Sequence, residues 1–220
     1  MVSPCCGTMV STLYLGFDLE NIQSVGFDMD GTLYCEYDFI DQVYSEIVHK
    51  ESNYLISLNE AETWIKNRWI EKGSSYPFIF GEAHDRFGVD SLERNAFIAR
   101  ALDRYRNFKP AIFLSKEVRV ALDFFKENYP IFLISDGNHI LQRNKFKSLG
   151  LGSWFDEDRV FFTGDFGSSY QKPSINILSH ISLSCAPENV LYFGDRKFDE
   201  DFCDAAGFKF EKVYIMKQAI

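Results

Sequence analysis

Short, almost continuous hydrophobic runs recur along the chain, and each one ends at a polar residue or a glycine. These runs cover residues 22–28, 131–135, 160–163 and 190–194. Runs of this length without alternation are typical of strands buried on both faces, as in a parallel sheet. Helical periodicity accompanies the later runs and predicts helices over residues 115–128, 139–149 and 174–183. Alternation of strand and helix predicts an α/β fold with a doubly wound parallel sheet.

The interval between the first two hydrophobic runs has a different pattern. It shows helical periods over residues 38–50, 59–72 and 91–107, and no convincing strand. Two caps are predicted there: a capping box formed by Asn59 and Glu62, and Ser91 at the start of the third helix. We therefore predict a smaller α-helical unit inserted after the first strand.

These patterns predict two domains and a short leading segment. The α/β core takes in two stretches that are separated in the sequence, and the helical unit lies between them. The predicted parts are the core at 20–36 and 112–220, the helical unit at 37–111, and an N-terminal extension at 1–19.

Composition narrows the class of protein. The chain has 220 residues, of which 46% are hydrophobic and 25% charged, as in ordinary globular domains. Its 23 basic and 32 acidic side chains give a formal net charge of −9. Such a charge argues against broad binding to nucleic acid or to an anionic membrane. We expect neither partner.

The cysteines and the N-terminal residues predict a location. The five cysteines are scattered and form no CxxC pair, which favours reduced thiols over disulfides or a zinc site. No run approaches the ~20 apolar residues of a spanning helix. The N-terminal segment has no Lys or Arg before its apolar part, so a secretory signal is not expected. The prediction is a cytoplasmic protein.

Candidate chemistry begins where the first predicted strand ends. The segment FDMDGTL places Asp28 and Asp30 one residue apart, just before Gly31. Alternate side chains of an extended segment point the same way, so the two carboxylates can converge beyond the strand's carboxyl end. Two acids at one point repel each other, which favours either a bound cation or a proton held on one of them.

The segment FDMDGTL resembles the first motif of the haloacid dehalogenase superfamily of phosphohydrolases. The other three motifs of that family have counterparts in the same order, each at a predicted strand end or helix start. They are Ser135-Asp136-Gly137, Lys172-Pro173, and Gly194-Asp195 followed by Asp199. The resemblance covers about residues 22 to 215 and implies a Rossmann-like core with a helical cap.

This resemblance also implies roles for the acidic residues. Asp28 corresponds to the nucleophile that forms an aspartyl-phosphate, and Asp30 to the general acid/base. By the family pattern, a metal ion is held by the Asp28 carboxylate, the Asp30 backbone carbonyl and Asp195. Asp199 corresponds to the second acid of the fourth motif, which holds a metal-bound water; the acidic stretch 199–201 leaves Asp201 as an alternative.

The chemistry of phosphoryl transfer agrees with these assignments. Ser135 and the backbone N–H groups of the turn through Asp136 and Gly137 can bind phosphate oxygens, and Lys172 can neutralise charge. Asp28, Asp30, Asp195 and Asp199 together carry four negative charges against one positive charge on Lys172. A phosphate dianion will not enter such a site unaided, so a divalent cation is implied. Oxygen ligands alone favour Mg²⁺.

One motif departs from the family pattern. Asp136 stands where the family usually has Asn, and its extra negative charge suggests that the side chain faces solvent or the leaving group.

Asp30 separates the reaction types within the family. Dehalogenases generally lack this second Asp, whereas phosphatases and phosphomutases keep it. We therefore expect a Mg²⁺-dependent phosphomonoester hydrolase acting on a small phosphorylated substrate. A sugar phosphomutase on the same site, a phospho-receiver module and a silent binding module stay open as alternatives, and so does the oligomeric state.

Overall fold

The computed structural model of the protein describes residues 19–213 and 215. The chain divides into two compact units, one formed by Met1–Glu36 with Ala111–Ile220 and the other by Tyr37–Pro110. We call them the core and the cap. The predicted N-terminal extension, with Cys5 and Cys6, lies outside the described residues apart from Leu19.

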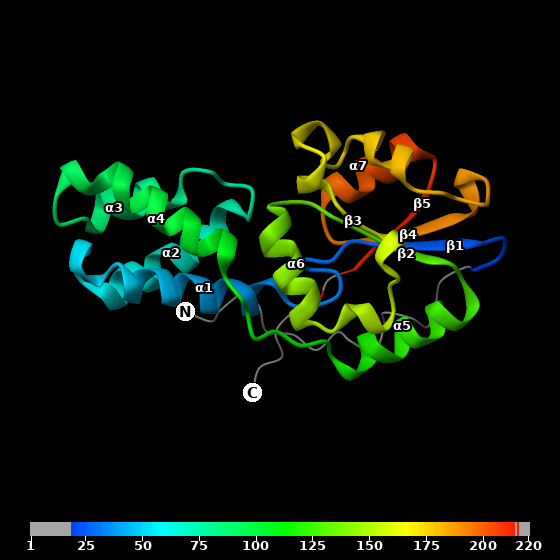
Figure 1. Ribbon diagram of the computed structural model, residues 1–220, viewed down its shortest axis with the longest axis horizontal. Coiled ribbons are helices and arrows are strands. Elements are labelled where there is room, and N and C mark those ends of the chain that lie inside the picture. Colours follow the sequence, from blue (N-terminus) through cyan, green and yellow to red (C-terminus); the bar gives the residue numbers. More distant parts are fainter. Residues whose placement is uncertain (1–18, 214, 216–220) are drawn as a thin grey trace. The chain divides into compact units, whose positions relative to one another are not determined.

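A five-stranded parallel sheet forms the centre of the core (Figure 1), with the strands in the order β3-β2-β1-β4-β5. The strands are β1 (Ser24–Phe27), β2 (Ile131–Ser135), β3 (Val160–Phe162), β4 (Val190–Gly194) and β5 (Lys209–Lys212). The first four lie within the four hydrophobic runs and confirm that these runs form strands. The sequence pattern did not indicate β5, because its four residues, KFEK, are largely polar and none is fully buried.

Helices cover both faces of this sheet. They are α5 (Lys116–Asn128), α6 (His139–Ser148) and α7 (Lys197–Ala206). Phe125 of α5 packs on Phe193 of β4, whereas Phe202 of α7 packs on the adjacent Tyr192. Neighbouring residues of a strand point to opposite faces, so α5 and α7 lie on opposite sides of the sheet (Figure 1). The doubly wound α/β fold is confirmed.

The segment 174–183, predicted as an α-helix after Pro173, is instead a 3₁₀ helix at Ile175–His180. Ser174 caps it by accepting a hydrogen bond from the Asn176 N–H at 3.3 Å. Six residues are too few for the 3.6-residue period to separate the two kinds of helix.

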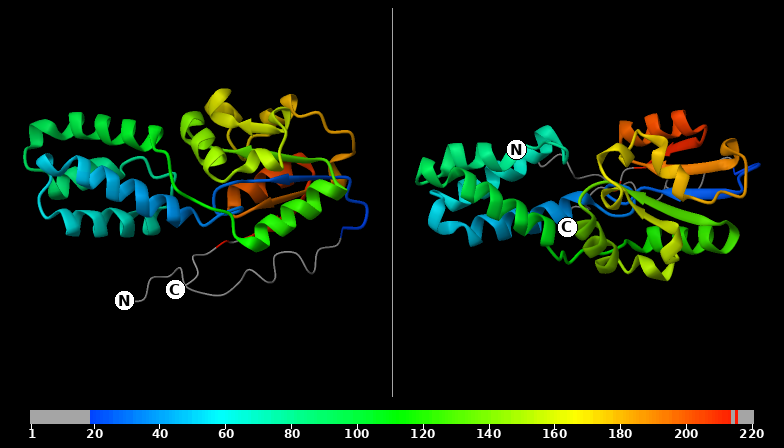
Figure 2. Two further views of the ribbon diagram at one scale, coloured as in Figure 1. Left: turned by 60° about the horizontal axis from the view of Figure 1, so that its bottom comes forward. Right: turned by 45° about the horizontal axis from the view of Figure 1, so that its top comes forward.

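The cap contains four α-helices within the described residues (Figure 2). They are α1 (Glu36–Lys50), α2 (Leu58–Lys72), α3 (Ile79–Phe87) and α4 (Arg94–Asn107). Three correspond to predicted helices; α3 was not predicted. Aromatic contacts join the helices: Phe39 to Tyr105, Tyr44 to Phe80, and Trp64 to Phe87. The helical insert is confirmed.

The two helix N-caps predicted for the insert, at Asn59 and at Ser91, are both wrong. Helix α2 begins one residue before Asn59, and Glu62 hydrogen-bonds Ser45 and Lys66 of the cap interior instead of closing a capping box. Ser91 lies in a short 3₁₀ turn ahead of α4, where the Asp90 carboxylate accepts from the Leu92 N–H at 2.9 Å. Glu62 therefore bonds to side chains that packing of the helices brings close, instead of to the backbone at the start of its own helix.

Within the residues that the structure describes, none of the helices has the length and hydropathy required to cross a membrane.

Candidate active site

The carboxyl ends of the central strands bring the predicted site residues together. Asp28 follows β1, Ser135 ends β2, and Asp195 follows β4 directly. Because these strands are parallel neighbours, their ends meet at one edge of the sheet, where α/β proteins of this type bind ligands. Gly31 permits the close packing there, since it has a φ of +77° and a side chain in its place would overlap with the Asp195 carboxylate.

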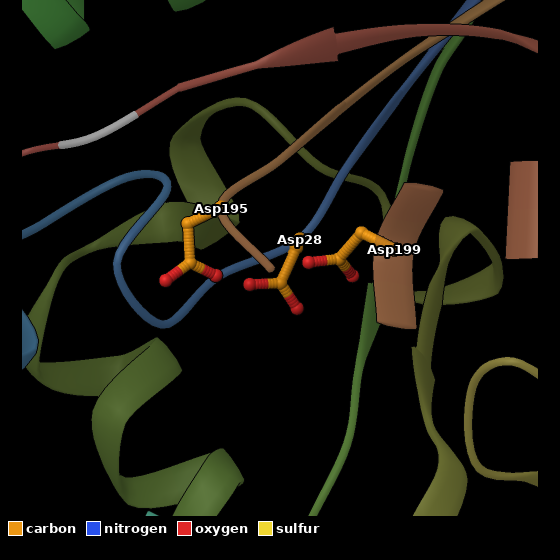
Figure 3. Close-up of side chains that lie close together, drawn as sticks. All are labelled: Asp28, Asp195 and Asp199. Carbon is orange, nitrogen blue, oxygen red and sulfur yellow. The ribbon is translucent and has the colours of Figure 1, made fainter. Parts of the chain in front are cut away.

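Three carboxylates form a cluster at this edge. One carboxylate oxygen from each of Asp28, Asp195 and Asp199 lies within 4.8 Å of the other two. Figure 3 shows the three side chains converging from the end of β1, the end of β4 and the start of α7. Asp28 and Asp199 are buried, and Asp195 is partly buried.

Lys172 lies against this cluster as a buried cation. Its Nζ donates to Asp28 Oδ1 at 2.7 Å and to Asp199 Oδ1 at 2.5 Å. It also lies 3.3 Å from the hydroxyl of Tyr192, which in turn donates to the Ile134 carbonyl. Burial opposes the charged form of Lys172, but the Asp199 and Asp28 carboxylates outweigh it and raise its pKa well above the usual value. Lys172 therefore stays charged.

Lys172 alone does not balance the cluster. Burial raises the pKa of Asp28 well above its usual range; Lys172 opposes this, and the Asp199 and Asp195 carboxylates add to it. Burial also raises the pKa of Asp195 to about 7, despite the opposing charge of Arg196. Crowded acids of this kind favour a bound cation, which would stabilise their ionised forms.

A metal ion fits this arrangement. Asp195 Oδ1 is buried and has no hydrogen-bond partner among the described residues, although a buried carboxylate oxygen ordinarily has one. The candidate metal ligands in the cluster are all carboxylate oxygens, the ligand type that Mg²⁺ and Ca²⁺ prefer.

The structure separates the two candidates for the second acid of the fourth motif. Asp199 is fixed on both sides, because its Oδ1 accepts from Lys172 and its Oδ2 accepts from the Arg196 N–H at 3.0 Å. Asp201 is partly exposed and pairs with Lys197 at 3.0 Å. Asp199 is thus the residue in the cluster.

Ser135 and its turn lie beside the cluster. Ser135 is 1% exposed, and its Oγ has no partner among the described residues. Gly137 has a φ of +114°, a conformation that glycine adopts without strain. A buried, unpartnered hydroxyl at this edge is free to donate to a ligand oxygen.

The Asp136 side chain turns toward its own scaffold. Its Oδ1 accepts from the Thr163 hydroxyl at 2.8 Å, and its Oδ2 accepts from the Lys172 N–H at 3.2 Å. The carboxylate therefore ties the turn after β2 to the segment that carries Lys172. The sequence suggested that this side chain faces solvent or the leaving group. In the structure, its two oxygens instead accept from Thr163 and from the backbone of Lys172.

Asp30 lies in a pocket of donors rather than in the carboxylate cluster. Its Oδ1 accepts from Lys145 Nζ at 2.7 Å and from the Tyr34 hydroxyl, and its Oδ2 accepts from Gln142 Nε2 at 2.7 Å. Burial opposes ionisation of this group, but the charge of Lys145 and the hydrogen bonds leave the pKa of Asp30 below its usual value.

Sequence reasoning missed these partners of Asp30. Gln142 and Lys145 are three residues apart on α6, so they share one face of the helix. That spacing was the available signal, but a helical lysine ordinarily lies in solvent. The formal charge of the site changes accordingly: Lys145 and Lys172 together provide two buried cations.

A comparison with known families decides the classification. The sequence model of a family described as haloacid dehalogenase-like hydrolase matches residues 22–207, most of the chain. The chain belongs to the haloacid dehalogenase-like hydrolases. The resemblance drawn from four motifs is confirmed, and so is the expectation that the protein is an enzyme of this class.

Relatives of this hydrolase include a curated archaeal enzyme. A glyceraldehyde 3-phosphate phosphatase of Methanothermobacter thermautotrophicus is 28% identical over 190 residues, which cover 84% of this chain and 81% of that protein.

Solved structures of other hydrolases share the fold, as two examples show. A superfamily hydrolase of subfamily IA, variant 1, from Geobacter sulfurreducens matches with a TM-score of 0.64 at 18% identity and covers 86% of each chain. A magnesium-bound hydrolase of the same superfamily from Bacillus subtilis also has a TM-score of 0.64, at 15% identity, covering 86% of this chain and 85% of that one.

Proposed function

We propose that this hydrolase is a Mg²⁺-dependent phosphatase that cleaves a small phosphorylated metabolite through an aspartyl-phosphate on Asp28. The observation that carries the proposal is the cluster of Asp28, Asp195 and Asp199 with Lys172 hydrogen-bonded between two of its members. Phosphoryl transfer depends mainly on positioning and charge stabilisation, and this arrangement supplies both.

The metal ligands in this proposal come from two strand ends. Asp28, Asp195 and the Asp30 backbone carbonyl would hold Mg²⁺, and Asp199 would accept from water at the ion. When bound, the ion neutralises charge on the transferring phosphoryl group and allows a dianion to approach the carboxylates. A magnesium-bound structural relative supports this choice of metal.

In the first step, a carboxylate oxygen of Asp28 attacks phosphorus. An acyl-phosphate bond forms while the bond from phosphorus to the ester oxygen breaks. Lys172 balances the negative charge on Asp28 and on the phosphoryl oxygens, and Ser135 Oγ donates to one of those oxygens together with backbone N–H groups of Asp136 and Gly137.

Asp30 moves the protons in this reaction. Because the Asp30 carboxylate is ionised in the free site, it must first take up a proton from water when the substrate binds; it gives this proton to the departing alkoxide oxygen, which leaves as an alcohol. It then takes a proton from the water that attacks the phosphorus of the acyl-phosphate, so that inorganic phosphate and the free Asp28 carboxylate are restored. Proton and phosphoryl group are both balanced over the cycle.

The curated relatives suggest where to look for the substrate. Proteins from three archaea at 25–28% identity are named glyceraldehyde 3-phosphate phosphatase, and each alignment covers at least 82% of this chain. A triose phosphate is therefore the first substrate to test, within the wider class of small sugar phosphates.

The first prediction concerns turnover. The purified chain is expected to release inorganic phosphate from at least one member of a panel of triose, pentose and hexose phosphates, and to lose that activity with a chelator and regain it with Mg²⁺. Asp28→Asn is expected to lower kcat by about 10³-fold or more, because an amide is a poor nucleophile.

Asp201→Asn is the matched control, since Asp201 lies near the cluster in sequence but pairs with surface Lys197. It is expected to keep wild-type turnover. Unchanged activity in Asp28→Asn, or full activity under chelation, would contradict the proposal. Isomerisation of a hexose phosphate without release of phosphate would instead indicate the phosphomutase alternative.

A further inference from the structure

A second buried lysine faces the active site, and the reaction described above does not use it. Lys145 of α6 is 2% exposed and donates to Asp30 Oδ1 at 2.7 Å. Two residues farther along the same helix, Lys147 is exposed. Burying an ammonium group is costly unless it is paired and hydrogen-bonded, and an apolar residue would fill that helix face at lower cost. The placement of Lys145 therefore points to a role at Asp30.

The donors around Asp30 hold both oxygens of its carboxylate. Lys145 and Tyr34 donate to Oδ1, and Gln142 donates to Oδ2 at 2.7 Å. Gln142 also donates to the Asp136 carbonyl at 2.5 Å, so the same amide links Asp30 to the turn after β2. A carboxylate held at both oxygens cannot rotate freely about its terminal bond.

We propose that Lys145 is a positioning residue for the general acid/base, holding the Asp30 carboxylate together with Gln142 so that it faces the ester oxygen of the substrate. This inference rests on the proposed phosphatase function and adds a named pair of side chains to it. The reason is geometric. Proton transfer requires an oxygen of Asp30 to lie within hydrogen-bond distance of the ester oxygen, and a small misplacement of a catalytic group lowers the rate by a large factor.

The leaving group provides the test. An alkyl phosphate such as glycerol 3-phosphate needs a proton on its departing oxygen, whereas 4-nitrophenyl phosphate releases a stable phenolate without one. The value of kcat/KM covers the steps up to departure of the leaving group. Lys145→Met is expected to lower kcat/KM for the alkyl substrate by ~10²-fold and for the aryl substrate only a few-fold.

The ratio of the two values is the decisive quantity. Both substrates are measured on one preparation, so a loss of folded protein cancels from the ratio. Lys147→Met on the same helix is the matched control and is expected to leave both values unchanged. Lys145→Arg, which retains the charge and the donors, is expected to restore part of the alkyl activity.

A double variant tests whether Lys145 acts through Asp30. Asp30→Asn alone is expected to show the same preference for the aryl substrate, and adding Lys145→Met to it is expected to change the ratio no further. Gln142→Leu removes the donor to Oδ2 without unpairing the lysine, and it is expected to shift the ratio in the same direction. It carries the test if Lys145→Met does not fold.

The outcomes separate this inference from the function on which it rests. If wild-type protein hydrolyses both substrates while Lys145→Met and Gln142→Leu slow them by equal factors, the positioning role is overturned and the phosphatase assignment stands. If wild-type protein hydrolyses no phosphoester at all, the proposed function falls and the inference falls with it.

Discussion

Asp136 occupies a position of the second motif, and its carboxylate bonds to the protein itself. Its carboxylate accepts from Thr163 and from the backbone of Lys172, and both of these donors belong to buried residues. The extra charge relative to Asn is thus held by donors of the protein itself. The side chain joins two segments of the active site that lie 36 residues apart.

This arrangement predicts unequal effects of two substitutions. Asp136→Asn keeps a carbonyl oxygen in the position of Oδ1, which lies within reach of both donors at 2.8 and 3.3 Å, and is expected to retain most of the activity and stability. Asp136→Ala leaves buried donors unpaired and is expected to cost about 1–3 kcal/mol in the free energy of unfolding. Denaturant unfolding and steady-state kinetics measure both effects.

A large rise in KM for Asp136→Asn, with unchanged stability, would contradict the scaffold role and indicate that the Asp136 carboxylate contacts the substrate.

Most residues of the candidate site could be predicted because their motifs occur in a fixed order at strand ends. Asp28 and Lys172 were found in this way, although they are 144 residues apart in the chain. Lys145 could not be found, because the pattern of α6 does not distinguish a lysine that faces solvent from one that reaches a carboxylate 115 residues away.

At the scale of elements, the packing of the central strand β1 against its neighbours requires a residue without a side chain at Gly26. Gly26 pairs in register with Phe132 on one side and Tyr192 on the other. A Cβ on Gly26 would overlap with both rings, and these rings also contact each other in the core. The glycine therefore makes room for two aromatic side chains.

Gly26→Ala is accordingly expected to destabilise the protein by about 1–3 kcal/mol, because a packed core tolerates added volume poorly. Gly152→Ala is the matched control: the nearest atom to its added carbon, on Phe146, is 3.9 Å away, which is ordinary van der Waals contact. Thermal unfolding of the two variants measures the difference. Equal melting temperatures would show that the rings move aside without cost.

The elements that the sequence did not predict have physical features in common. The strand β5 is short and polar, and α3 is only nine residues long. Patterns of this length carry little periodicity, so pairing with β4 and packing against the other cap helices decide their structure.

At the scale of the whole molecule, the charge of the site couples metal binding to stability. The chain has a formal net charge of −9, and three of its carboxylates converge at one sheet edge. A cation that binds this folded cluster but not the unfolded chain stabilises the fold by mass action.

Mg²⁺ is therefore expected to raise the melting temperature of the protein, by an amount equivalent to about 2.7 kcal/mol at a hundred times its Kd. Asp195→Asn is expected to remove most of this increase, because it replaces the carboxylate whose buried oxygen has no partner among the described residues. K⁺ at equal ionic strength is the control. An equal increase with K⁺, or with Mg²⁺ in Asp195→Asn, would contradict a specific site.

The sequence by itself determined the parallel core, the helical insert and the residues at the strand ends. These follow from local hydrophobic pattern and from motif order, both of which are properties of short segments. Only the tertiary structure decided which polar side chains pair across the fold: Lys172 with Asp28 and Asp199, and Lys145 with Asp30. Such pairs depend on how distant elements pack, and burial in a medium of low dielectric makes their charges strong enough to matter.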